Sequence, residues 1–194
     1  TGVGATTPLG GDVQSTWRAL LAGESGITTI DAEWVAQYEL PVTFAGQAKV
    51  AASEVLTPQE AKRLDPSSQF ALIAAREAWA DAGSPEVTPE RLAVEYATGI
   101  GGVWTLLDAF ETLKERGPRR VLPMTIPMLM PNGPAAAIGM DIAARGGVRT
   151  AVSACASSTE AIANAITRLQ SGEIDVVVAG GCESGIHPLP IAAF

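Results

Sequence analysis

The segment Thr150-Ala151-Val152-Ser153-Ala154-Cys155-Ala156-Ser157-Ser158 joins a strand-like run to a helical one. Residues 148–152 have the short, apolar character of a strand, and Ile162, Ile166 and Leu169 then recur at helical spacing until Gly172. A strand, a turn of small residues and a helix in this order lift the side chain at the turn out of the sheet. The segment therefore predicts that Cys155 is presented at the start of a helix.

Strands and helices alternate over the rest of the chain. Strands are expected over 92–99, 148–152 and 175–179, and helices over 13–21, 70–82, 106–116, 134–142 and from near Ser157 to near Gly172. The run Asp175-Val176-Val177-Val178-Ala179 is typical of a strand that is buried on both faces. Residues 31–56 predict loops with a minor strand, and prolines make the start of 121–134 irregular. This alternation predicts an α/β layered fold with a mostly parallel or mixed sheet.

The composition excludes several classes of protein. The chain has 194 residues, of which 47% are hydrophobic and 18% charged, so it can bury a core as one domain. Its net charge of −8 does not suit a nucleic-acid binder. No apolar run is long enough for a membrane span. Two cysteines and one histidine do not form a zinc-binding pattern, and without a secretory signal we expect a cytoplasmic protein with reduced thiols.

The two ends of the sequence both predict continuation. Residues 1–5 are typical of the exit from a strand whose beginning is missing. The chain stops in the apolar run 188–194, which has no polar tail and needs a surface to pack on. We therefore expect a piece cut at both ends from a longer sequence; two natural termini are the alternative.

Cys155 is the main candidate for chemistry. Unpaired amides and the helix dipole at a helix start favour a thiolate, and the small neighbours would let a bulky acyl group approach the sulfur. The alternative is a buried, inert cysteine. Cys182 follows the 175–179 strand and is expected to be a core cysteine at a strand end.

Other motifs have simpler interpretations. The glycine clusters at 2–4, 99–102 and 180–181 lack the third glycine of a dinucleotide fingerprint and predict tight turns, so we expect no nucleotide cofactor. His187 lies in a loop bounded by glycine and proline, and is expected to be a surface or turn residue. Met124, Met128 and Met130 either pack in the core or line a lipid-accepting surface.

Several motifs in order resemble those of one family. The segment 152–157 followed by Glu160-Ala161-Ile162-Ala163 resembles the nucleophile segment of β-ketoacyl-acyl carrier protein synthases. The segments 1–10, 98–102, 130–133 and 175–181 resemble further landmarks, so the resemblance spans the chain and points to elongating type II enzymes, including the mycolic-acid-elongating branch. Ser158 departs from the family pattern, which usually has glycine there.

The resemblance implies a fold and a reaction. The fold would be the N-terminal half of a thiolase-like α/β fold, a mixed five-stranded sheet covered by helices, spanning residues 1–194 with the C-terminal half absent. The reaction would be a decarboxylative Claisen condensation of fatty-acid elongation, which uses no cofactor and no metal. Cys155 would carry the acyl chain as a thioester, and its backbone N–H would be half of the oxyanion hole.

The resemblance also implies binding residues and partners. Ile100 and Phe194 would line the acyl pocket. A basic patch of Lys62, Arg63, Arg119 and Arg120 would meet the acidic acyl carrier protein, loaded with acyl or malonyl groups. The family dimerises through this half, which implies a homodimer.

The family's two catalytic histidines, its active-site lysine and its second oxyanion donor would follow residue 194. We therefore expect the isolated chain to be incompetent for condensation. Three alternatives stay open: a thiolase-type enzyme acting on coenzyme A, a non-catalytic chain-length subunit, and a module that serves only dimerisation. Chain-length subunits usually lack the cysteine at the turn, so Cys155 argues against that alternative.

Overall fold

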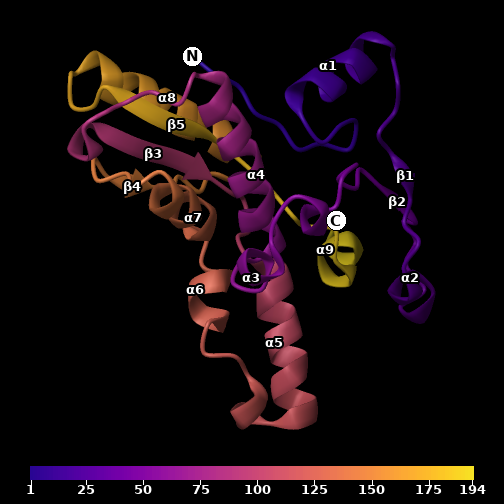
Figure 1. Cartoon of the computed structure of the whole chain (residues 1–194). Helices are drawn as coiled ribbons and strands as arrows, with labels where there is room; N and C mark the ends of the chain where they lie inside the picture. The colour runs from indigo at the N-terminus through magenta and orange to yellow at the C-terminus, as the bar shows by residue number, and fades with distance from the viewer.

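A parallel sheet forms the centre of the computed structural model, which describes residues 1–194 (Figure 1). Its three strands are β3 (Leu92–Ala97), β4 (Val148–Arg149) and β5 (Val176–Gly181), in the order β4-β3-β5. Leu92 pairs with Val176 at one end of β3 and β5, and Ala97 pairs with Gly181 at the other. The loops that follow the three strands therefore leave the sheet on the same side, at the carboxyl ends of the strands.

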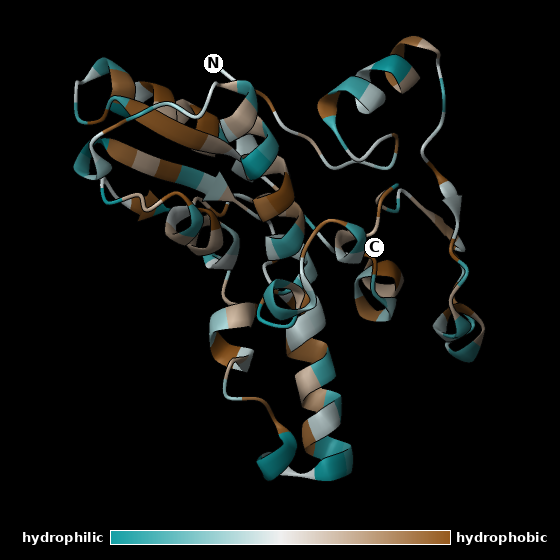
Figure 2. Cartoon of the chain, viewed as in Figure 1, coloured by the Kyte–Doolittle hydropathy of each residue, from teal (hydrophilic) through white to brown (hydrophobic).

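Helices cover both faces of this sheet. Helix α8 (Ser157–Gln170) packs on one face, and helices α4 (Pro66–Asp81) and α7 (Gly133–Asp141) pack on the other. Val94 and Tyr96 of β3 form the main core with Ala71 of α4 and Ile138 of α7. In Figure 2 the most hydrophobic ribbon runs through the sheet. The α/β class expected from the sequence is confirmed as three layers.

The strand buried on both faces is β3, and the sequence prediction for β5 is wrong on this point. Every residue of β3 is buried, whereas the residues of β5 are half-buried or exposed. The reason is strand order, because β5 lies at an edge and has no neighbour on its outer side. Glu95 interrupts the apolar run of β3, so a hydrophobicity pattern does not identify β3 as the central strand.

The expected single five-stranded mixed sheet is also wrong for this chain. Its five strands form two separate sheets, because β1 (Thr28–Thr29) pairs only with β2 (Phe44–Ala45), in an antiparallel hairpin away from the main sheet. The structure therefore combines a parallel three-stranded sheet with a distant antiparallel pair.

The N-terminal residues are extended, but they pair with no strand. The amide of Val3 donates to Asp81 of α4 at 2.9 Å, and the amide of Ala5 donates to Glu77 at 2.8 Å. Gly4 lies so close to α4 that an added Cβ would come within 1.9 Å of the carbonyl oxygen of Ala74. Carboxylates of a helix thus take the hydrogen bonds that a neighbouring strand would accept.

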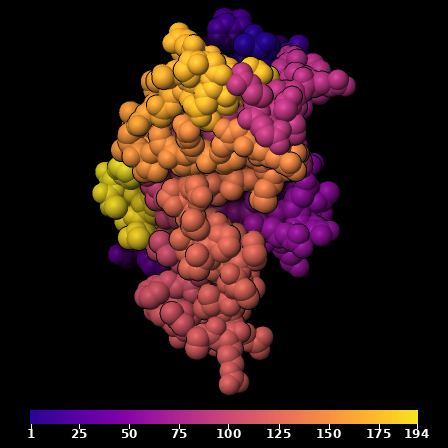
Figure 3. All heavy atoms as spheres, turned by 90° about the vertical axis from the view of Figure 1, so that its left-hand side faces the viewer, coloured from indigo at the N-terminus to yellow at the C-terminus, as the bar shows by residue number.

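The other elements surround this core. Helices α5 (Val103–Arg116) and α6 (Thr125–Leu129) project from the sheet as a separate lobe (Figures 1 and 3). No helix combines the length and the apolar character needed to cross a membrane. The remaining helices are α1 (Val13–Leu21), α2 (Glu33–Gln37), α3 (Pro58–Ala61) and α9 (Pro188–Ala193), and the 3-10 turns are Ala52–Glu54, Pro89–Arg91, Pro118–Arg120 and Ala154–Ala156.

A buried ion pair joins α8 to the centre of the sheet. Arg168 of α8 donates to Glu95 of β3 at 2.8 Å, and the two side chains are only 4% and 2% exposed. Arg168 also donates to the carboxylate of Glu173 and to the carbonyl of Gly146. Because Arg168 satisfies three acceptors at once, it fixes the position of α8 on the sheet.

Removal of one partner from this pair should destabilise the protein strongly. We expect Arg168→Met to lower the free energy of unfolding by about 3–5 kcal/mol, because the Glu95 carboxylate would stay buried without a counter-charge. Urea denaturation measures the difference. The control Arg149→Met removes only an exposed ion pair with Glu173 and should cost less than about 1 kcal/mol. Equal losses in the two variants would contradict the prediction.

Candidate functional site

The turn between β4 and α8 has a strained and hydrogen-bonded geometry. Ala154 has a φ of 52°, which a residue with a side chain rarely adopts. The hydroxyl of Ser157 accepts from the amide of Ser153 at 2.9 Å and donates to the carbonyl of Ala154 at 2.7 Å. Ser157 is itself buried and opens α8. This side chain therefore holds the bend from inside.

Cys155 stands at the outside of that bend. Its side chain is exposed and in no disulfide, so the expected alternative of a buried cysteine is wrong, and its reactivity stays a prediction. Its backbone N–H has no acceptor within the chain. At this position before a helix the thiol can attack a carbonyl carbon, and the free N–H of the same residue can stabilise the resulting oxyanion.

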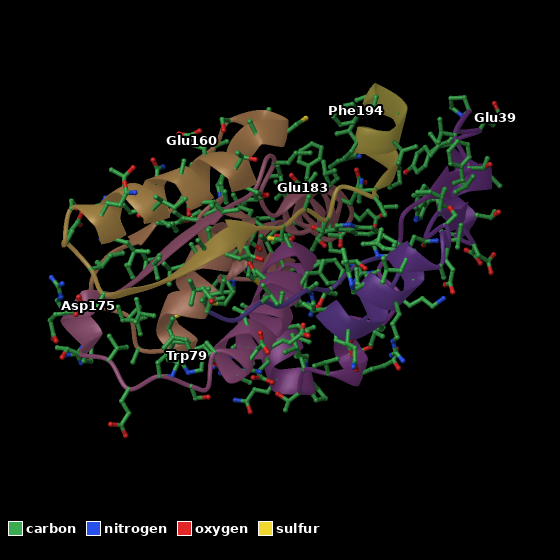
Figure 4. The ribbon with its side chains drawn as sticks, turned by 90° about the horizontal axis from the view of Figure 1, so that it is seen from above. Glu39, Trp79, Glu160, Asp175, Glu183 and Phe194 are labelled. Carbon is green, nitrogen blue, oxygen red and sulfur yellow. The ribbon has the colours of Figure 1, made fainter.

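An open cavity of about 480 Å³ adjoins the thiol. The structure brings Cys155, Ile100 and Phe194 together in its wall, although they come from three separate segments. Phe194, which directly follows α9, is fully exposed, and Figure 4 shows it beside that helix. The residues proposed for the nucleophile and for the acyl pocket thus share one cavity.

The departure at Ser158 has a local explanation. The Ser158 hydroxyl lies against Gly181 of β5, where an added Cβ would come within 2.0 Å of it. Gly181 has no side chain, so it leaves the space that the Ser158 hydroxyl occupies. A glycine at position 158 would not need this space. The serine fits without a change in the turn that carries Cys155.

Cys182 lies at a strand end, as expected, but it is half-buried and also lines the cavity of Cys155, whereas His187 lies in the turn before α9. Cys182 packs against the main core, and burial raises the pKa of its thiol, with a further increase from the carboxylates of Glu183 and Asp65. His187 is the N-cap residue of α9, where its Nδ1 accepts from the amide of Leu189 at 3.4 Å. Burial lowers the pKa of His187, which packs edge-on against Trp104. The histidine does not line the cavity of Cys155.

The four basic residues do not form the single patch expected from the sequence. Lys62 and Arg63 directly follow α3 and precede Asp65, which accepts from Thr105 at the start of α5, whereas Arg119 and Arg120 follow the far end of α5. Helix α5 has 14 residues and is therefore about 21 Å long. All four side chains are exposed, and none forms an ion pair within the chain. The patch is instead two separate basic pairs.

The methionines contribute nothing to the cavity of Cys155. Met124 and Met130 are partly exposed around the short helix α6, and Met128 lies between them on that helix. The carbonyl of Met128 approaches Gly102 closely, because an added Cβ there would come within 2.4 Å of it. This glycine therefore serves backbone packing, and the lipid-accepting surface stays a prediction.

Sequence reasoning missed Glu183. Its carboxylate accepts from the amides of Gly99 at 2.9 Å and Ile100 at 3.1 Å, and it lines the cavity of Cys155. One signal pointed to it, since a charged residue two positions after an apolar parallel strand lies near the carboxyl end of that strand, where ligands bind.

The fold and the site define a three-layer α/β protein with a nucleophile-type cysteine at a helix start. The chain belongs to the β-ketoacyl synthase family, because the model of the "Beta-ketoacyl synthase, N-terminal domain" matches residues 1–194.

Curated relatives extend this assignment. The chain is 40% identical over 194 residues to a protein of Mycobacterium tuberculosis named 3-oxoacyl-[acyl-carrier-protein] synthase 2, with 100% of this chain and 46% of the relative covered. It is 38% identical over 200 residues to the protein of the same name from Staphylococcus aureus, with 100% and 48% covered. The chain thus spans about half the length of the curated relatives it matches.

Solved structures share the fold. A β-ketoacyl synthase from Burkholderia phymatum matches with a TM-score of 0.82 and 27% identity, covering 97% of this chain and 47% of that one. A type II polyketide ketosynthase, solved in complex with its acyl-carrier protein, matches with a TM-score of 0.78 at 16% identity over 100% of this chain and 52% of that one. The thiolase-like fold class expected from the sequence is therefore confirmed.

The two cysteines should differ sharply in reactivity. We expect iodoacetamide to modify Cys155 at least about tenfold faster than Cys182 in the folded protein, because only the thiolate reacts and burial keeps Cys182 protonated. A raised pKa means that Cys182 loses its proton only at more alkaline pH, so the difference should persist up to pH 9. Peptide mass spectrometry measures both rates. Cys155→Ala removes the fast reaction, and comparable rates in the unmutated protein would contradict the prediction.

Proposed function

We propose that residues 1–194 are the N-terminal half of a β-ketoacyl-[acyl-carrier-protein] synthase of fatty-acid elongation, an acyltransferase. The observation that carries this proposal is the shared wall of Cys155, Ile100 and Phe194 around one open cavity. The names and the lengths of the relatives support the proposal.

The first half-reaction follows from the turn. The Cys155 thiolate attacks the carbonyl carbon of an acyl-carrier thioester, and the carrier leaves as a thiolate, which then takes a proton from water. The oxyanion of the tetrahedral intermediate is placed to accept a hydrogen bond from the free N–H of Cys155. The acyl chain then lies along Ile100 and Phe194 as a thioester of Cys155.

The second half-reaction needs groups that this chain does not contain. Malonyl-carrier loses CO₂, and the resulting carbanion attacks the acyl thioester and releases the Cys155 thiolate. The developing enolate needs donors and a proton-transferring group. His187, the only histidine, is the cap of α9 and does not line the cavity. We therefore assign this half-reaction to the full-length protein.

The outer face of α8 supports a second half of the fold. Ala161 and Ala165 face the sheet and are buried, whereas Ile162, Ile166 and Leu169 are 47%, 49% and 39% exposed. An apolar stripe of this kind on a single helix needs a partner. We propose that the rest of the full-length protein covers it.

The partners follow from charge and from the sheet edges. Two exposed basic pairs, Lys62 with Arg63 and Arg119 with Arg120, are suited to an acidic carrier protein. A homodimer is supported by the free outer edge of β4 with the exposed Val148 and Val152, and a sedimentation mass of twice the protomer checks it. A cytoplasmic location stays a prediction.

The full-length protein tests this function. We expect it to release CO₂ and form a β-ketoacyl product from acyl- and malonyl-carrier, and to lose product formation by at least about 10³-fold on Cys155→Ala. Residues 1–194 alone should form no product.

The other outcomes of this assay are equally decisive. Faster turnover with acetyl-coenzyme A than with carrier substrates would favour the thiolase-type alternative. Unchanged product formation by Cys155→Ala, or condensation by residues 1–194 alone, would contradict the proposal.

A further inference from the structure

Glu183 bridges the ends of two parallel strands. It follows β5, and its Oε2 accepts from the amides of Gly99 and Ile100 in the loop that follows β3. Its Oε1 accepts from the hydroxyl of Thr98 at 3.1 Å, and that hydroxyl in turn accepts from the amide of Gly101 at 3.0 Å. The Glu183 carboxylate therefore binds Thr98, Gly99 and Ile100 directly. It binds Gly101 indirectly, through the Thr98 hydroxyl.

Ser184, the residue after Glu183, donates to a buried carboxylate. Ser184 donates from its hydroxyl to Asp65 at 3.4 Å, and Asp65 is fully buried at the start of α4. Asp65 also accepts from the amide and hydroxyl of Thr105, in the first turn of α5. The loop 98–102 is thus anchored at one end by Glu183 and at the other by the fixed start of α5.

This loop forms part of the cavity wall beside the nucleophile. Gly99 packs against the bend of Cys155, since an added Cβ would lie 3.4 Å from the carbonyl oxygen of Ala154. Ile100, the next residue, lines the cavity and is 44% exposed there. Figure 4 shows Glu183 beyond the end of β5, between α8 and α9. Any shift of the loop would change the distance between Ile100 and the thiol of Cys155.

We propose that Glu183 is a positioning residue that fixes the Ile100 wall against Cys155 and thereby sets which acyl chains the cavity accepts. The proposal rests on the proposed acyl transfer to Cys155. Both carboxylate oxygens already accept hydrogen bonds from the loop, so Glu183 acts through the loop and not on the substrate. The loop residues that Glu183 binds determine which acyl chains fit, and Cys155 remains the nucleophile.

The substitution Glu183→Met tests the proposal in the full-length protein. Methionine keeps the approximate size of the side chain but has no carboxylate, so the amides of Gly99 and Ile100 and the Thr98 hydroxyl lose their acceptor. We expect these two amides to exchange hydrogen at least about tenfold faster, while the amides of β3 keep their protection. The ratio of Cys155 acylation rates with octanoyl- and palmitoyl-carrier should change at least about threefold.

Two further variants keep the test decisive. Thr98→Val removes the acceptor of the Gly101 amide and one donor to Glu183, so it should speed exchange at Gly101 and change the rate ratio, also where Glu183→Met does not fold. Glu86→Met changes an exposed carboxylate without contacts in the chain and should change neither readout.

Unchanged exchange, or an unchanged rate ratio, in the Glu183 and Thr98 variants would overturn the proposal. If the unmutated protein does not acylate Cys155, the proposed function fails. Hydrogen exchange then still decides whether Glu183 holds the loop.

Discussion

The geometry of the site depends on the hydroxyl of Ser157. It bonds to the chain on both sides of Ala154, whose backbone lies in the left-handed region. Without these two hydrogen bonds the bend would relax, because a left-handed alanine is stable only when its surroundings impose it. The bend turns Cys155 outward and leaves its N–H free, whereas Ser157 itself is buried under α8. A buried serine thus supports an exposed nucleophile.

The parallel sheet explains why the other residues of the site gather there. Strands β3, β4 and β5 all end at the same edge, so the loop of Ile100, the turn of Cys155 and the segment of Glu183 leave the sheet together. Strand β5 continues through Glu183 toward α9, which carries Phe194 to the same cavity. The ion pair of Arg168 with Glu95 holds α8 on the sheet from the opposite end of the helix.

Sequence patterns predicted the features that depend on neighbouring residues in the chain. The alternation of apolar residues located β3, α4 and α8, and small residues between a strand and a helix located Cys155. The burial of β5, the single sheet and the single basic patch were predicted wrongly, because each depends on which segments meet in space. Glu95 reads as a solvent-exposed position until Arg168, 73 residues later, is placed beside it. Glu183 was missed for the same reason, since its partners lie 83–85 residues earlier.

The most direct test of the account is the mass of the Cys155 peptide after the full-length protein meets acyl-carrier without malonyl-carrier. The account predicts that this peptide gains the mass of one acyl group, that hydroxylamine removes it, and that the Cys182 peptide stays unmodified. An acyl group on Cys182, on a serine of the turn, or on no residue at all would contradict the assignment of Cys155 as the nucleophile.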